Sequence, residues 1–180
     1  MLRSLMVALV LTTGVANAQD TPLPNVPVPA LDLQRYSGQW HEIAHLPMFF
    51  QRECAANITA TYTPRTDGTI GVRNACDEED GTRSVSEGTA RTVAGHPGRL
   101  EVRFAPGWLG WMPMVWADYW VVDLDPEYRW AVVGGPDRKY LWILSRTPTM
   151  PRARFDELRA RAAGRGYPVD WLVLPAGTLE

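Results

Sequence analysis

The chain has 180 residues and a formal net charge of −2 at neutral pH, with 18 Lys and Arg residues against 20 Asp and Glu residues. This balance argues against a nucleic-acid-binding protein, which needs a basic surface. A chain of this length is expected to form one domain with a sizeable hydrophobic core.

Residues 1–18 have the pattern of a secretory signal peptide. Arg3 supplies the positive charge, residues 5–15 are apolar, and Ala16-Asn17-Ala18 is a small-x-small cleavage site. The apolar stretch is too short for a stable membrane span. We therefore expect export and cleavage after Ala18. No cysteine near that site could carry a lipid anchor.

Strand-like segments make up most of the remaining chain. Residues 19–30 contain four prolines and predict an extended lead-in. The segments that follow, separated by turn residues, are 38–46, 55–63, 69–76, 83–93, 99–105, 117–124, 129–134 and 140–146. Because no helix is expected between them, they favour an antiparallel barrel or sandwich.

The two cysteines, Cys54 and Cys76, predict one disulfide, because an exported protein meets an oxidising compartment. Residues 62–70 have the pattern of a strand, a turn and a strand, with Asp67-Gly68 as the turn signal. The expected register pairs Tyr62 with Gly68, Ile58 with Val72, and Cys54 with Cys76. Two free buried thiols are the alternative.

One helix is expected after the strands. Thr149 is its candidate N-cap, Pro151 suits its first turn, and Gly164 or Gly166 ends it. Three apolar residues share one stripe of this helix: Phe155, Leu158 and Ala162. Such a stripe indicates a helix that packs on the outside of the strands. Residues 171–174 predict a last short strand.

Three motifs resemble the signatures of the lipocalins. Tyr36, Gly38 and Trp40 form a Tyr-x-Gly-x-Trp entry to the first strand. Residues 123–133 are similar to the second lipocalin signature, and residues 141–146 are similar to the third. The subgroup that the chain resembles most is the bacterial outer-membrane lipocalins, which are akin to apolipoprotein D.

This resemblance covers about residues 30–175 and implies an all-β fold. The implied architecture is an eight-stranded up-and-down antiparallel β-barrel with one C-terminal α-helix packed outside, in a single lipocalin domain over residues 31–180. Barrels of this size leave an interior that holds side chains or one small ligand.

The lipocalin pattern assigns structural roles at the closed end of the barrel. It implies that Arg146 packs over Trp40 as a cation–π pair, with Gly38 beside them. Because side chains alternate along a strand, Trp142 and Leu144 then point into the lumen as well.

Two further strands are expected to present apolar faces to the lumen, because their opposite faces are polar. Ile58 and Tyr62 lie on one of these faces, and Val72 and Asn74 lie on the other. By position, Tyr62, Asn74 and Trp142 resemble pocket residues of apolipoprotein D. Apolar walls with a few polar groups suit a small hydrophobic ligand. The alternative is a lumen that these side chains fill completely.

The stretch GWLGWMPMVWADYW, residues 107–120, holds four of the eight tryptophans. The lipocalin resemblance places the loop 106–116 at the open mouth of the barrel. Trp108, Trp111 and Met114 are then expected to form an apolar lip that meets a ligand or a membrane surface. A loop that plugs the mouth, or that is buried in a homodimer, is the alternative.

No catalytic or metal-binding constellation is apparent in the sequence. It contains neither a Gly-x-Ser-x-Gly nucleophile motif nor a phosphate-binding loop. His41 and His45 are four residues apart on a presumed strand, about 13 Å, which is too far for one metal ion to bridge. We therefore predict no catalytic residue, no metal and no cofactor. Glu42 and Glu87 are expected to bond within the barrel or to face solvent.

The resemblance implies a periplasmic protein that binds and carries a small hydrophobic ligand, with a fatty acid or a lysophospholipid as the first candidate, in the maintenance of cell-envelope lipids. The alternatives are a lipocalin-scaffold enzyme, a haem- or isoprenoid-binding protein, and a membrane-docking module that uses the loop 106–116.

Two sequence features refine this expectation. The bacterial relatives are usually lipoproteins with a cysteine at the cleavage site, whereas this chain has Ala-Asn-Ala-Gln-Asp there. Any association with the outer membrane is therefore expected to come from the loop 106–116. Arg52, Arg73 or Arg103 near the mouth would favour an anionic head group.

Overall fold

The computed structural model describes residues 22–105, 112 and 115–180. The predicted signal peptide and Trp108, Trp111 and Met114 of the predicted lip lie outside the described residues. Within the described ranges, no helix is long and apolar enough to cross a membrane.

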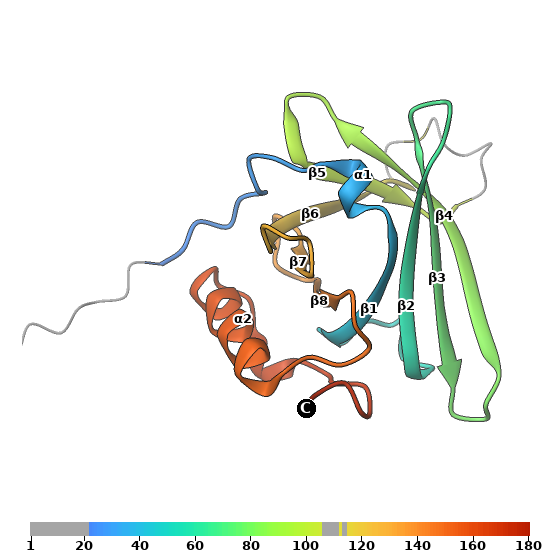
Figure 1. The fold of residues 1–180 in the computed structure, drawn as a ribbon. Coiled ribbons are helices and arrows are strands. Elements are labelled where there is room, and N and C mark those ends of the chain that lie inside the picture. Colours follow the sequence, from blue (N-terminus) through green and yellow to red (C-terminus); the bar gives the residue numbers. More distant parts are fainter. Residues whose placement is uncertain (1–21, 106–111, 113–114) are drawn as a thin grey trace, which may run out of the picture.

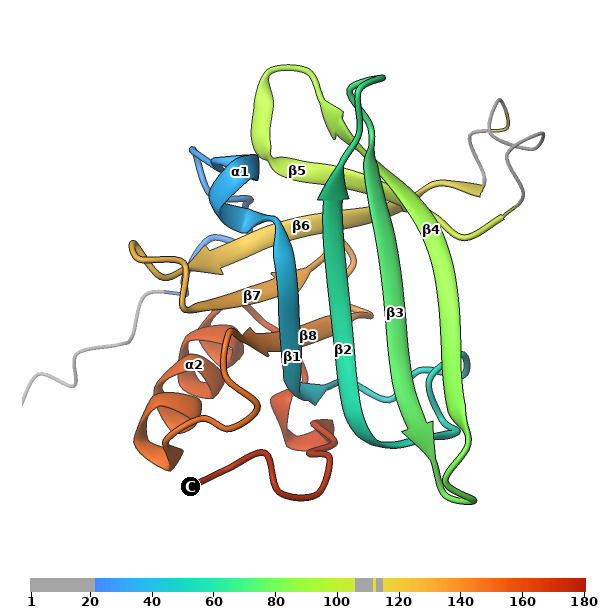
Figure 2. The ribbon, with the colours of Figure 1, turned by 45° about the vertical axis from the view of Figure 1, so that its right-hand side comes forward.

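The described residues form eight antiparallel strands that close into a barrel (Figures 1 and 2). The strands are β1 (Gly38–His45), β2 (Cys54–Pro64), β3 (Ile70–Glu78), β4 (Arg83–Val93), β5 (His96–Arg103), β6 (Ala117–Leu124), β7 (Trp130–Gly134) and β8 (Leu141–Ser145). Each strand pairs with the next one along the chain, and β1 closes the barrel by pairing with β8. The predicted fold class is therefore confirmed.

Successive side chains of a strand point alternately into two apolar clusters, one inside and one outside the barrel, as β8 illustrates. Leu144 packs in the interior cluster with Trp142 against it, whereas Leu141 and Ile143 belong to a second cluster outside the barrel. The inward orientation expected for Trp142 and Leu144 is the one observed. A pleated strand with two apolar faces therefore serves both the lumen and the outer helix.

The outer cluster lies under α2 (Arg152–Gly164), which runs beside β7 and β8 in Figure 1. The helix buries its predicted apolar stripe: Phe155, Leu158 and Ala162. The predicted N-cap at Thr149 is wrong, because Pro151 occupies the N-cap position without a side-chain cap. The Thr149 hydroxyl instead donates to the carboxylate of Glu180.

The strand predicted at residues 171–174 is also wrong. Residues Val169–Trp171 form a 3-10 helix (η3), and Val173 makes a single bridge with His45 of β1. Pro168 and Pro175 flank this segment, and neither has an N–H group to extend a strand ladder. The segment therefore pairs with the barrel sheet at one residue only, although Val169 and Leu172 also pack against the outer cluster.

The proline-rich lead-in is extended and bonded to the domain. The backbone N–H of Leu23 donates to the carbonyl of Gly164 at 2.9 Å, and that of Val28 donates to Val121 at 2.8 Å. These bonds hold residues 22–28 against α2 and β6. The sequence predicted the extended conformation but not this attachment.

A short helix that the sequence did not predict, α1 (Leu33–Tyr36), leads into β1 at the closed end of the barrel. Its N-cap is Asp32, whose carboxylate accepts hydrogen bonds from the backbone N–H groups of Gln34 and Arg35. Gly38 then has φ +90°, a conformation that favours glycine. This requirement explains the glycine of the first signature.

Trp40 is fully buried at the closed end. The Arg146 guanidinium lies 3.8 Å from the centroid of its ring, and the Trp40 indole N–H donates to the Tyr36 carbonyl at 2.8 Å. The structure thus contains the contact between Arg146 and Trp40 that the resemblance implied, and this contact shuts one end of the barrel.

The predicted register of the β2–β3 hairpin is wrong. Tyr62 lies opposite Val72, and Cys54 lies opposite Glu78 rather than Cys76. The turn lies later than expected, because the N–H of Arg65 bonds to the carbonyl of Thr69 at 2.8 Å and closes the hairpin around residues 66–68. The centre of the hairpin therefore falls about two residues later than the predicted pairing required.

The predicted disulfide between Cys54 and Cys76 is nevertheless present, with 5.5 Å between the Cα atoms. The strand register shifts twice between Cys54 and Thr59, and Asn57 in this stretch has φ +48°. These β-bulges bring the two cysteines within disulfide reach although they are not a directly opposed pair.

Candidate ligand-binding cavity

The barrel encloses a cavity of about 460 Å³. Small-molecule sites typically range from about 300 to 1,000 Å³. The wall is mainly apolar and aromatic, and a minority of its side chains carry polar groups. Its residues are Glu42, Phe50, Gln51, Cys54, Ile58, Thr59, Ala60, Tyr62, Val72, Asn74, Ala75, Cys76, Ser84, Ser86, Val102, Phe104, Val115, Ala117, Asp118, Tyr119, Val133, Tyr140, Trp142 and Leu144. This composition suits a small apolar ligand with a limited number of polar atoms.

Three tyrosines form the polar part of the interior near the closed end. The hydroxyl of Tyr119 is 2.7 Å from that of Tyr36 and 2.8 Å from that of Tyr62. Burial raises the pKa of Tyr62 to about 12 and raises the pKa values of Tyr36 and Tyr119 well above their usual range. The hydroxyls are therefore neutral at physiological pH and can both donate and accept hydrogen bonds.

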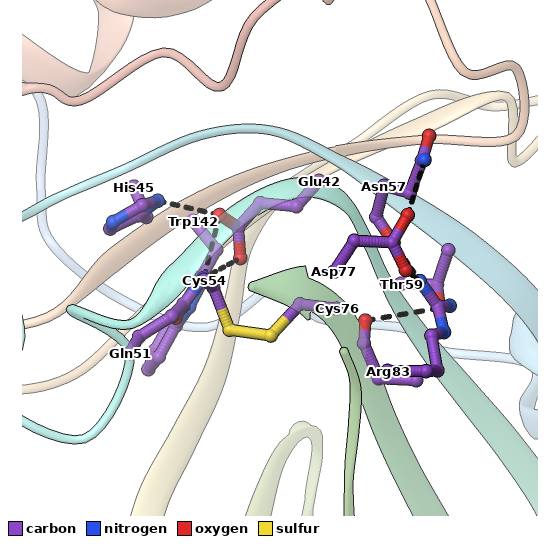
Figure 3. Close-up of a disulfide and its surroundings, with 11 residues drawn as sticks. Glu42, His45, Gln51, Cys54, Asn57, Thr59, Cys76, Asp77, Arg83 and Trp142 are labelled. Atoms are coloured by element: carbon purple, nitrogen blue, oxygen red, sulfur yellow. Dashed lines mark hydrogen bonds and ion pairs between the residues drawn. A yellow bond between two sulfur atoms is a disulfide. The ribbon is translucent and has the colours of Figure 1, made fainter. Parts of the chain in front are cut away.

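A buried carboxylate lies in the wall on the side of the open mouth. Glu42 is 6% exposed, and both of its carboxylate oxygens accept from the side-chain amide of Gln51, at 2.7 and 2.6 Å. His45 Nδ1 lies 2.5 Å from Glu42 Oε1 (Figure 3). The indole N–H of Trp142 donates to Gln51 Oε1 at 3.3 Å. Gln51 thus attaches the β1–β2 loop to β1 and β8.

The disulfide lies next to this cluster in Figure 3, and both of its cysteines line the cavity. On its other side, the Arg83 guanidinium contacts Asp77 at 2.6 Å, and the Asn57 amide donates to the same carboxylate at 2.6 Å. These two hydrogen bonds, from Asn57 and then Arg83, lower the pKa of Asp77. The ends of β2, β3 and β4 are thereby joined near the mouth.

An aromatic series runs from the protein surface to the cavity wall. Ring centroids are 5.2 Å apart for Phe49 and Phe50, 6.0 Å for Phe50 and Tyr140, and 6.0 Å for Tyr140 and Trp142. Phe49 is 75% exposed and Phe50 is 57% exposed. The mouth therefore presents aromatic surface to the surroundings, and that surface continues into the cavity.

A closed eight-stranded barrel with an outer helix, an arginine over a buried tryptophan and an apolar lumen is the arrangement that the sequence motifs implied. Residues 31–176 match the model of the family described as Lipocalin-like domain. The chain belongs to the lipocalin family.

Individual relatives agree with this assignment. The chain is 40% identical to outer membrane lipoprotein Blc of Escherichia coli over 169 residues, which cover 89% of this chain and 90% of the relative. It is 40% identical to temperature-induced lipocalin-1 of Arabidopsis thaliana over 148 residues, which cover 81% and 78%. The structure of insecticyanin from the tobacco hornworm Manduca sexta superposes with a TM-score of 0.65 at 21% identity, covering 84% of each chain, and supports the fold alone. The predicted family and its Blc-like bacterial subgroup are confirmed.

The structure places all six of the predicted ligand-binding residues that it describes in the cavity wall of this lipocalin: Ile58, Tyr62, Val72, Asn74, Trp142 and Leu144. They come from β2, β3 and β8 and meet around one cavity. Their contacts with a ligand remain a prediction. The other three predicted contacts, Trp108, Trp111 and Met114, lie outside the described residues.

Sequence reasoning missed several wall residues. Tyr119 alternates with Val121 on the inward face of β6, and the alternation rule already used for β8 could have found it. Phe50, Gln51 and Tyr140 had no periodic signal, because they lie in loops or beside a strand end. Their roles depend on the three-dimensional fold of the mouth.

The arginines expected near the mouth do not line the cavity in the described part of the chain. Arg52 and Arg73 are exposed, and Arg73 lies on the outer face of β3. The guanidinium of Arg103 lies 4.8 Å from the centroid of the Trp116 ring. An anionic head group inside the cavity would therefore not meet these three side chains.

The acids and histidines considered from the sequence have separate locations. Glu42 bonds within the barrel and Glu87 is exposed. A register shift in β1 between Glu42 and Ala44 separates the half-buried His41 from the buried His45. Among the described residues, no group of three or more His, Cys, Asp or Glu side chains could hold a metal ion.

Proposed function

We propose that this lipocalin binds and carries a small hydrophobic molecule in the bacterial periplasm, in the maintenance of cell-envelope lipids. The observation that carries the proposal is the cavity of about 460 Å³ with a mainly apolar wall inside a closed barrel. Relatives at about 40% identity that are named outer membrane lipoprotein support a role in the bacterial envelope.

The ligand class that we propose is a fatty acid or a lysophospholipid. A single acyl chain can occupy a narrow apolar lumen while its polar head stays near the mouth. The exposed rings of Phe49 and Phe50 support a transient contact with a membrane surface during ligand uptake. The protein then acts as a carrier and not as an enzyme.

Native mass spectrometry of the protein purified from its own periplasm, followed by lipid extraction, tests this function. We expect one fatty acid or lysophospholipid per chain. A chain that carries no lipid and whose tryptophan fluorescence does not respond to either lipid class would overturn the carrier proposal.

A titration with the recovered lipid then locates the site. Trp142→Ala removes a large part of the cavity wall and should weaken binding about 10-fold or more. Trp171→Ala is the matched control, because Trp171 is 71% exposed and does not line the cavity. Equal affinities for both variants would place the ligand outside the cavity.

A further inference from the structure

The charged side chains of the cavity wall are all acidic. Among the described residues that line the cavity, only Glu42 and Asp118 are charged, and neither Lys nor Arg is present. The sequence of residues 106–114 adds no Lys, Arg or His. An anionic group of a ligand inside the cavity would therefore meet acidic side chains in the wall and no wall cation among the described residues.

The two wall carboxylates have different partners. Asp118 is paired with the Arg99 guanidinium at 3.1 Å, and its side chain is 35% exposed. Glu42 is 6% exposed, and its contacts are the Gln51 amide and His45 Nδ1. A carboxylate offers about four acceptor positions. Three contacts are made in the structure, so Glu42 can accept a further donor from a ligand in the cavity that it lines.

Aromatic rings line the same cavity as this carboxylate, and Trp142 is linked to it through Gln51. Phe50, Tyr140 and Trp142 all line the cavity, and successive ring centroids lie 6.0 Å apart. The hydrogen bond from Trp142 to Gln51 holds the indole beside the amide that contacts Glu42, as Figure 3 shows. Aromatic faces are electronegative and attract cations, and they do so most strongly where water is excluded.

We propose that Glu42 forms, together with Phe50, Tyr140 and Trp142, a subsite for the positively charged ammonium group of an amphiphilic ligand. The cavity then selects amphiphiles that carry an ammonium group, cationic or zwitterionic, over free carboxylates. This inference rests on the proposed carrier function and narrows its ligand class, because it ranks lysophospholipids with an ammonium head group ahead of fatty acids.

Three amphiphiles with the same saturated chain test the selection: a primary alkylammonium, the alkyl alcohol and the alkanoate. Each is titrated into the full protein below its micelle concentration and followed by calorimetry. We expect the ammonium compound to bind about 10-fold or more tightly than the carboxylate, with the alcohol between them.

The Glu42→Gln variant assigns this preference to the carboxylate. The amide retains the size of the side chain, so the alcohol should bind as it does to the wild type, while the ammonium compound loses about 10-fold in affinity. Glu53→Gln is the matched control, since it removes the same charge from an exposed residue of the β1–β2 loop that does not line the cavity. It should preserve the order of the three ligands.

The outcomes separate the two proposals. If the alkanoate binds the wild type as tightly as the ammonium compound, or if Glu42→Gln keeps the full preference, the ammonium subsite is wrong and the carrier function stands. If none of the three compounds binds, the carrier function fails as well. Should Glu42→Gln fail to fold, as circular dichroism would show, Trp142→Leu replaces it and should weaken the ammonium compound more than the alcohol.

Discussion

The two ends of the barrel each hold a charged side chain, but the surroundings of these two side chains differ. At the closed end, Arg146 stacks on Trp40, and its guanidinium donates to the backbone carbonyls of Gln39, at 2.8 Å, and Arg35, at 2.6 Å. At the open end, the buried Glu42 contacts an amide and an imidazole and also faces a cavity. The closed end is filled by packed and hydrogen-bonded side chains, which stabilise the fold. The open end contains an unfilled cavity and a carboxylate that a ligand could contact.

This difference predicts where substitutions affect stability and where they affect binding. Tight packing makes each lost atom costly, because the neighbours cannot fill the space. A wall that borders a cavity tolerates a change of side chain better, because the side chain already has unfilled space on one face. Substitutions at the two ends should therefore separate into two classes.

The largest effect is expected at the closed end. Trp40→Ala should lower the free energy of unfolding by about 3 to 5 kcal/mol, because a fully buried indole is removed. Urea denaturation followed by circular dichroism measures this change. Trp171→Ala, at a 71% exposed position, is the control and should stay within about 0.5 kcal/mol of the wild type. A loss below about 1 kcal/mol for Trp40→Ala would contradict the tightly packed closed end.

The disulfide is the main covalent stabilisation of the open end. The cysteines are 22 residues apart, and a loop of that length predicts a loss of about 3 kcal/mol for the double substitution of Cys54 and Cys76 by Ser. Chemical reduction of the wild-type protein should produce a similar loss in urea denaturation. Identical stabilities of the oxidised and reduced proteins would show that the crosslink adds nothing.

The three buried tyrosines should make the free energy of unfolding fall at alkaline pH. Because the pKa of Tyr62 is raised to about 12 in the folded protein, the unfolded chain loses this proton first, near its ordinary pKa of about 10. Tyr62 therefore contributes about 2 to 3 kcal/mol to the free energy of unfolding. This contribution is complete below pH 10 and is lost as pH rises through 12. Urea midpoints across this range test the effect, and Tyr62→Phe should reduce its slope. A stability independent of pH there would show that the hydroxyls are not protected.

A smaller loss of stability is expected when the guanidinium of Arg146 is replaced by an ammonium group of the same charge. Arg146→Lys should destabilise the protein by about 1 to 2 kcal/mol, because the ammonium group cannot stack on Trp40 and reach four carbonyl groups at once. Ligand affinity should be unchanged, since Arg146 does not line the cavity. A ligand affinity that falls with stability would mean that the two ends are coupled.

The strands could be predicted from the sequence because their signals are local, and the resemblance to the lipocalins then implied a barrel rather than a sandwich. Alternating side chains marked the strands, and the Tyr-x-Gly-x-Trp motif marked the entry to β1, where Gly38 needs its positive φ. The inward orientation of Trp142 and Leu144 on β8 followed from Arg146, whose position the resemblance to the lipocalins implied. The strand signals depend on neighbours in the sequence, whereas the closure of the barrel and the position of Arg146 came from the resemblance.

The parts that sequence reasoning missed depend on irregular backbone. The register shifts of β2 near Asn57 altered the pairing of Cys54, although the crosslink itself was predicted. Gln51 and Phe50 reach the cavity from a loop that has no periodicity. Glu42 was expected to bond within the barrel or to face solvent, but its partners Gln51 and His45 become visible only in the folded structure.

A pair of substitutions on β4 tests most directly whether the barrel interior is the binding site. Ser86 lines the cavity, whereas its neighbour Val85 is 44% exposed and does not. We expect Ser86→Trp to fill the mouth and weaken lysophosphatidylcholine binding about 10-fold or more in a fluorescence titration, and Val85→Trp to bind like the wild type. Wild-type affinity in both variants would contradict a ligand site inside the barrel.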